Sequence, residues 1–118
     1  QARACGCSFC TMHGGIWTSH PGARLRVAIK RTDAVSRYEF ETRTAAFHVC
    51  AHCGVVPFVT CEIDAKRYAV VNVNTFKNVD KSLIAQHPMS FDGETLESRL
   101  ARRARYWIGD VTFATPPR

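Results

Sequence analysis

Hydrophobic and polar residues alternate along several short segments of the chain, which is the pattern of strands with one buried face. In residues 24–30, Leu25, Val27 and Ile29 fall on one side, and basic residues fall on the other. Successive side chains of a strand point to opposite faces, so the apolar side meets a core and the basic side meets solvent. We therefore predict a half-buried strand here.

Four further segments favour strands: residues 35–41, 45–49, 55–60 and 68–75. The last two are apolar and β-branched, which is typical of strands. Pro57 cannot donate a hydrogen bond to a neighbouring strand, so it indicates an edge or a bulge in the segment 55–60. The chain is therefore predicted to be mainly β.

The pattern changes after residue 80. Residues 80–85 have the length of one helical turn. Farther on, apolar residues recur at helical spacing, at Leu96, Leu100, Ala104 and Trp107. Asp92 is the predicted N-cap and Gly109 the predicted end of this helix. A short C-terminal helix should therefore accompany the strands.

Length and composition narrow the class of protein. A chain of 118 residues makes one domain, and a hydrophobic content of 46% is typical of a globular one. No apolar run approaches the roughly 18 residues of a membrane span, and the N-terminus does not resemble a signal peptide, so we expect a cytoplasmic protein without a membrane partner. The net charge of +6 suits an anionic partner, and a solvated surface rich in arginine explains it equally well.

Five of the six cysteines lie in two clusters, which are Cys5, Cys7 and Cys10 and the pair Cys50 and Cys53. In a cytoplasmic protein, such CxCxxC and CxxC spacings favour a metal site over disulfides. Zn²⁺ takes four ligands in a tetrahedron, so the pair supplies half of a closed structural site. The triplet supplies three ligands and leaves the fourth position open, which is the pattern of a catalytic zinc. A metal site without chemistry, or free thiols, are the alternatives for the triplet.

The pair Cys50 and Cys53 lies in a predicted turn between two strands, in which Gly54 would allow a positive φ. The sequence alone does not determine which other residues would complete a zinc site on this pair. Cys5 and Cys7 could join the pair, or Cys61 could do so with His48 or His52, or the pair could stay empty. As a lone cysteine in a strand, Cys61 is more typical of a small buried hydrophobic residue.

Two other features are candidates for the site. His13 follows Cys10 at a spacing compatible with a ligand or a proton carrier, and it also fits a polar loop residue. Asn72 and Asn74 are two residues apart in a strand and so could form one wall of a pocket. The favoured interpretation is that their side chains hold two loops by hydrogen bonds.

Several segments together resemble the glutathione-dependent formaldehyde-activating family, to which the centromere protein V-like domains are similar. They are CGCSFC, the pair Gly14 and Gly15, FHVCAHCGVVPF, AVVNVNTFKNVD and SFDG. The resemblance runs from about Cys5 to Gly93. The combination of CxCxxC with a later CxxCG is its most specific part.

The resemblance implies a fold of several small coiled antiparallel sheets around a zinc-binding cysteine cluster. It implies a catalytic zinc on Cys5, Cys7 and Cys10, and a structural zinc on Cys50 and Cys53 together with an N-terminal CxC pair. The implied activity is that of a zinc-dependent carbon–sulfur lyase or synthase. Its co-substrate is glutathione, which it joins to formaldehyde as S-(hydroxymethyl)glutathione.

The sequence departs from the family pattern at its start. Family members carry the CxC pair some tens of residues before CxCxxC, whereas Gln1 stands four residues before Cys5. We therefore expect a single domain over residues 1–118 that lacks its CxC segment. Two other functions remain: a non-catalytic zinc-stabilised module that binds nucleic acid or protein through the arginines of 99–105, and a thiol scavenger without turnover. Nucleic acid is the weaker of these partners, because few aromatic residues accompany the arginines.

Overall fold

The computed structural model describes residues 2–5, 10, 12, 14–39, 44–77, 85–89 and 93–114. This part of the chain is mainly β, as predicted. Its strands are β1 (Ala2–Cys5), β2 (Ile16–Thr18), β3 (Arg24–Ala28), β4 (Val35–Tyr38), β5 (Ala45–Cys50), β6 (Phe58–Ile63), β7 (Lys66–Asn72), β8 (Gln86–Met89) and β9 (Asp110–Ala114). One helix, α2 (Leu96–Tyr106), and two 3₁₀ turns, η1 (Thr32–Ala34) and η2 (Val73–Thr75), accompany them.

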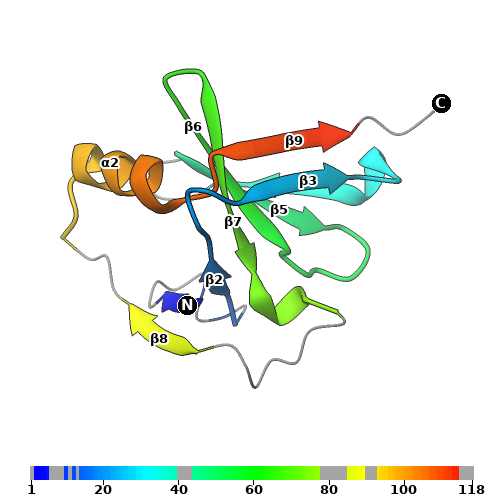
Figure 1. Cartoon of the computed structure of the whole chain (residues 1–118). Helices are drawn as coiled ribbons and strands as arrows, with labels where there is room; N and C mark the ends of the chain where they lie inside the picture. The colour runs from blue at the N-terminus through cyan, green and yellow to red at the C-terminus, as the bar shows by residue number, and fades with distance from the viewer. Residues whose placement is uncertain are drawn as a thin grey trace.

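The strands form two sheets in the described residues (Figure 1). The larger has seven strands in the order β4-β5-β6-β7-β2-β1-β8, and all neighbours in it are antiparallel except β1 and β8. The smaller sheet is the parallel pair of β3 and β9. The several small antiparallel sheets that we expected are thus one large sheet and one parallel pair.

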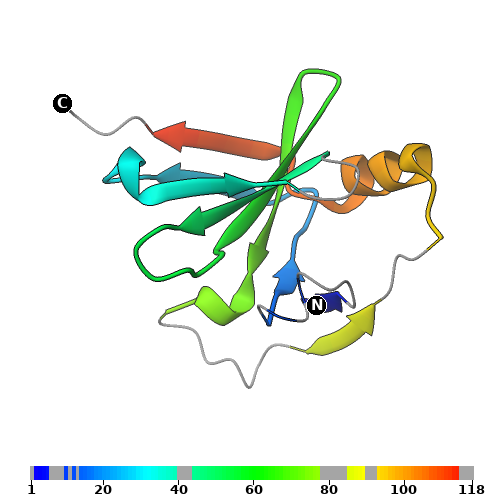
Figure 2. The same cartoon turned by 180° about the vertical axis from the view of Figure 1, so that it is seen from behind.

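The hairpin of β6 and β7 runs through the middle of the molecule (Figures 1 and 2). Its strands meet at the pair Ile63 and Lys66, so the turn has only two residues. Both of these, Asp64 and Ala65, have positive φ, of 51° and 65°. A two-residue turn of this hand matches the twist of the strands that it joins, and therefore closes the hairpin tightly.

One face of the large sheet carries the main core. Its buried residues include Phe47 of β5, Val59 and Cys61 of β6 and Val70 of β7, all in one cluster. The other members are Cys10, Trp17, Val56 and Trp107. Leu100 of α2 packs against the cluster, so the helix lies at the margin of this face.

The parallel pair β3–β9 lies over the opposite face. Phe113 of β9 lies 5.8 Å from Phe58 and 6.0 Å from His48, measured between ring centroids. Val27 of β3 faces the same way as Phe113, its register partner, and is buried. The predicted strand at 24–30 therefore exists, and its apolar side is covered as expected.

The other strand predictions hold with changed ends. The segments 35–41 and 45–49 correspond to β4 and β5. The predicted strand 55–60 begins only after Pro57, whose carbonyl accepts a hydrogen bond from the backbone of Asn72. β7 ends at Asn72 because its side chain caps the 3₁₀ turn that follows.

The helix differs from its prediction at both ends and on its buried side. Its N-cap is Thr95, whose hydroxyl accepts a hydrogen bond from the backbone of Ser98, while the predicted cap Asp92 lies outside the described residues. It ends at Tyr106, with Trp107 as its C-cap, rather than at Gly109, because Ile108 already pairs with Ala69 of β7. Of the predicted apolar positions, Leu96 and Ala104 are exposed.

Four strands had no counterpart in the sequence analysis: β1, β2, β8 and β9. The first three are three or four residues long, too short for a period of two to stand out. Of the predicted helical turn at 80–85, only residue 85 is described, and it is not helical. No helix in the described part of the chain is long and apolar enough to cross a membrane.

Candidate metal centre

A tight turn brings Cys50 and Cys53 together at the end of β5. The backbone N–H of Cys50 donates to the carbonyl of Val55 at 2.8 Å, and that of Gly54 donates to the carbonyl of Cys50 at 2.7 Å. Gly54 has a φ of 81°, which confirms the role predicted for it. The turn therefore doubles the chain back on itself immediately after the second cysteine.

The same turn directs hydrogen-bond donors at one sulfur. The backbone N–H groups of Cys53 and His52 donate to the Cys50 thiol, and the Cys53 side chain bonds to it as well, so the pKa of Cys50 is lowered. A metal ligand must be the thiolate, and amide donors stabilise that form. The pair thus suits half of a zinc site in its donor chemistry.

The N-terminal cysteines lie against the core. Cys5 ends β1 and packs on the core cluster, while Cys10 is buried, with 4% of its surface exposed. The indole N–H of Trp17 donates to the sulfur of Cys10 at 3.2 Å. Cys7 and His13 lie outside the described residues. Trp17 therefore covers the buried sulfur of Cys10.

Hydrogen bonds from η2 hold the loop between Cys10 and β2. The side chain of Asn74 donates to the carbonyl of Gly14 at 2.6 Å. The side chain of Asn72 is buried; it accepts from the backbone of Ile16 at 3.3 Å and donates to the carbonyl of Val56 at 3.0 Å. The two asparagines thus connect loops, which was the favoured interpretation of this pair.

Among the described residues, no three side chains of His, Cys, Asp or Glu come together as a metal site. The geometry bears on the alternative in which Cys61 and His48 complete the site of Cys50 and Cys53. Cys61 lies on the core face of β6, whereas His48 lies on the other face, where its Nε2 is 2.8 Å from the Thr60 hydroxyl. The pair of cysteines cannot be completed by both of these residues.

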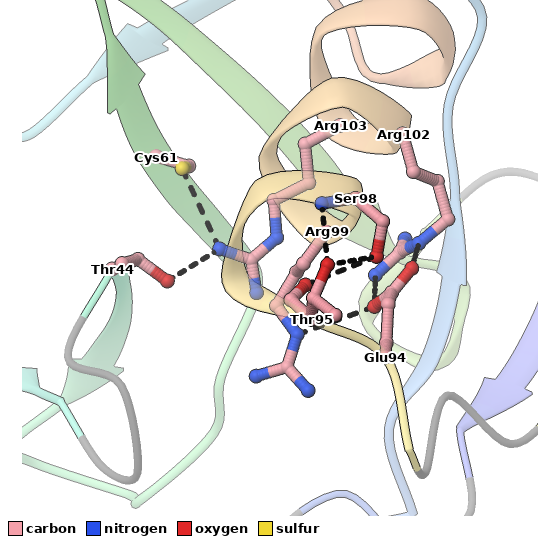
Figure 3. Close-up of polar contacts among 8 residues, drawn as sticks. All are labelled: Thr44, Cys61, Glu94, Thr95, Ser98, Arg99, Arg102 and Arg103. Carbon is pink, nitrogen blue, oxygen red and sulfur yellow. Dashed lines mark hydrogen bonds and ion pairs between the residues drawn. The ribbon is translucent and has the colours of Figure 1, made fainter.

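Cys61 is buried, as predicted, and it contacts a buried arginine. Nη1 of Arg103 donates to Cys61 at 3.5 Å and to the hydroxyl of Thr44 at 2.8 Å (Figure 3). The guanidinium also lies over the ring of Trp107, 5.1 Å from its centroid. Burial lowers the pKa of Arg103, and its Nε has no partner within the described residues.

Two more helical arginines are held by one carboxylate. Glu94 accepts hydrogen bonds from Arg102 at 2.8 and 3.1 Å and from Arg99 at 3.2 Å (Figure 3). Of the arginines at 99–105, only Arg105 is largely exposed. Most of the basic stretch that suggested nucleic-acid binding therefore stabilises the helix instead.

A polar cavity of about 620 Å³ lies on the sheet face opposite the core. Its lining includes Arg37, Glu39, His48, Thr60, Arg67 and Phe113. Burial, helped by the charges of Arg37 and Arg67, lowers the pKa of His48 to about 4. The sequence analysis did not find this cavity. The polar residues on the solvent side of the predicted strands could have indicated it, but only the apolar side of those strands was interpreted, as core.

Comparison with protein families and with curated proteins gives no match. The chain is similar to a solved crystal structure of a Rhodobacter sphaeroides protein, a structural genomics target, at 27% sequence identity. The likeness covers 74% of this chain and 78% of the other, with a TM-score of 0.53. It supports the overall arrangement of the strands.

Proposed function

We propose that this protein is a zinc-dependent carbon–sulfur lyase or synthase that joins glutathione to formaldehyde. The observation that carries the proposal is the cysteine turn, in which amide donors and the Cys53 thiol meet the sulfur of Cys50, in the same chain as CxCxxC. Spacings of this kind favour metal over disulfide in a reducing compartment, so we place the protein in the cytoplasm.

Cys50 and Cys53 would hold a structural zinc, and Cys5, Cys7 and Cys10 would hold a catalytic one. A bound zinc lowers the pKa of a thiol and makes it a nucleophile at neutral pH. Trp17 keeps water from the sulfur of Cys10, because its ring is buried and its N–H already bonds to that sulfur. The Asn74 bond to Gly14 fixes the loop that follows.

The proposed reaction forms one bond between carbon and sulfur. The thiolate of glutathione attacks the carbon of formaldehyde, the carbon–oxygen π electrons move to oxygen, and the alkoxide takes a proton. The product is S-(hydroxymethyl)glutathione. The net charge of +6 favours the approach of glutathione, which carries two carboxylates.

The alternative is a zinc-stabilised module that binds nucleic acid or another protein without catalysis. Its motivation was the arginines of 99–105. Because Arg99, Arg102 and Arg103 are engaged with Glu94, Thr44 and Cys61, this alternative has less support than the enzyme.

Zinc content measured by elemental analysis tests the metal sites. We expect the reduced protein to contain zinc and Cys7→Ser to hold one zinc ion per chain fewer. Cys61→Ala is the matched control, because Cys61 lies in the core outside both clusters, and it should keep the full content. A protein without zinc, or equal loss in both variants, would contradict the proposal.

Adduct formation tests the activity. The purified protein should form S-(hydroxymethyl)glutathione faster than glutathione and formaldehyde alone, and Cys7→Ser should lose the acceleration. Product that stops at one equivalent of protein would instead indicate a scavenger. Zinc binding without any acceleration would favour the binding module.

A further inference from the structure

The polar cavity beneath β9 is separate from the cysteine clusters. His48 and Thr60 lie on its floor, on the face of β5 and β6 that points away from Phe47, Cys61 and the rest of the core. Phe113 of β9 forms part of its wall. Most of its lining thus belongs to the face that Phe113 approaches, while Ala45 and Leu100 of the lining pack against the core cluster to which Cys10 belongs.

Two arginines at this cavity have guanidinium groups that internal partners do not neutralise fully. The side chain of Arg37 makes no ion pair or hydrogen bond with any residue in the described part of the chain. Arg67 is 3.6 Å from Glu62, and its guanidinium lies over the ring of Phe113, 4.6 Å from the centroid. A pair at 3.6 Å with an exposed carboxylate is weak, so Arg67 can accept a better partner.

The floor between these arginines offers neutral hydrogen-bonding groups. Thr60 is 5% exposed, and its hydroxyl lies 2.8 Å from Nε2 of His48. His48 is also stacked on Phe58, with 4.4 Å between ring centroids, so its position is fixed. A hydroxyl and two guanidinium groups are the donors that recognise a carboxylate, and the arginine fork can hold both of its oxygens.

We propose that this cavity binds a small organic carboxylate, held by Arg37 and Arg67 with its apolar part against Phe113. The volume of about 620 Å³ lies within the range of small-molecule sites, at roughly 300–1,000 Å³. Phe113 and Ala46 supply apolar wall beside the charged groups, which is the usual composition of such a site. The site is independent of zinc and of the proposed reaction.

Benzoate is the first probe, and benzamide is its control, because the two have nearly the same shape and differ in charge. Calorimetric titration should show binding of benzoate and at least tenfold weaker binding of benzamide, as expected when a charge-assisted pair is lost. Equal affinities, or no benzoate binding at about 10 mM, would overturn the proposal, since that concentration exceeds the Kd of most specific small-molecule sites.

Exposed positions supply variants that should fold. Arg37→Gln should weaken benzoate binding roughly tenfold, whereas Glu39→Gln, two residues away on the same side, should leave it unchanged or strengthen it. Arg26→Gln is the matched control for charge, because Arg26 pairs with Thr112 on the outer side of the β3–β9 pair. Equal weakening in Arg37→Gln and Arg26→Gln would show a general charge effect and would overturn the site.

Discussion

Gly54 shows how one residue determines the cysteine turn. Its φ of 81° is rarely adopted by other residues, and nothing lies within 4 Å of the place that a Cβ would take. Gly54→Ala should therefore lower the free energy of unfolding by the conformational cost alone, about 1 kcal/mol. Chemical denaturation of the zinc-free proteins measures this difference.

Replacement of Gly15 by alanine should affect stability differently from replacement of Gly54. A Cβ on Gly15 would come within 2.7 Å of the Trp17 ring, which bonds to Cys10, so the ring would have to move. Gly15→Ala should lower the free energy of unfolding more than Gly54→Ala does in the same measurement. The reverse order would mean that the Trp17 ring is free to shift and does not fix Cys10.

The sequence predicts those side chains whose role depends on near neighbours. Gly54 in its turn was predicted correctly, because turn chemistry acts over a few residues. The loop-connecting role of Asn72 was predicted as well, but its position at the end of β7 was not, because the strand was expected to run to residue 75. The pairing of His48 with Thr60 was missed. It depends on the register of β5 against β6, which places these side chains next to each other across the sheet.

Among the elements, α2 depends on a carboxylate that precedes it. Glu94 is 14% exposed and bonds to both Arg99 and Arg102. Glu94→Gln should lower the free energy of unfolding by about 1 kcal/mol, because it removes the charge from three hydrogen bonds. Glu97→Gln, on the exposed side of the same helix, is the matched control and should have little effect.

The same carboxylate should make the stability of the helix depend on pH. The hydrogen bond from Arg102 lowers the pKa of Glu94 from its usual 4.5. Its contribution is therefore complete above the unfolded pKa and is lost as the pH falls below about 4.5 toward the folded value. Urea denaturation between pH 6 and pH 3 should show the wild type and Glu94→Gln converging; a constant difference would contradict this.

Element types were more predictable than element ends. The alternation of apolar and polar residues in 24–30 and 35–41 was sufficient to predict β3 and β4. The buried side of α2 was predicted only in part: Leu100 and Trp107 lie at the core as expected, whereas Leu96 and Ala104 are exposed and Arg103 is buried. Arg103 takes a buried place, since Thr44, Cys61 and Trp107 satisfy part of its guanidinium.

In the molecule as a whole, the β3–β9 pair acts as the second layer over the sheet. Phe113 contacts Phe58, His48 and Arg67 across the two layers. Phe113→Ala should therefore lower the free energy of unfolding by about 2 kcal/mol, since the ring is only partly buried. Thr112→Ala, its exposed neighbour on the other side of β9, should change stability by less than about 0.5 kcal/mol.

The arrangement of the two layers could not be predicted from the sequence. The strands β3 to β7 were predicted, but β1 pairs with β8 and β3 pairs with β9 across most of the chain. No local pattern specifies such partners. The cysteine spacing predicted two clusters, and the structure confirms that Cys50 and Cys53 meet in a turn, while a zinc on the triplet stays a prediction.

The parallel pairing of β3 with β9 has a consequence for synthesis in the cell. The chain emerges from the ribosome with its N-terminal part first, and β3 has no partner in the second layer until residue 114 is released. During that interval Phe58 and His48 lack their cover, while β4 to β7 can already pair as neighbouring hairpins. The nascent protein thus exposes an apolar surface until β9 has emerged, and a chaperone would have most to protect during that interval.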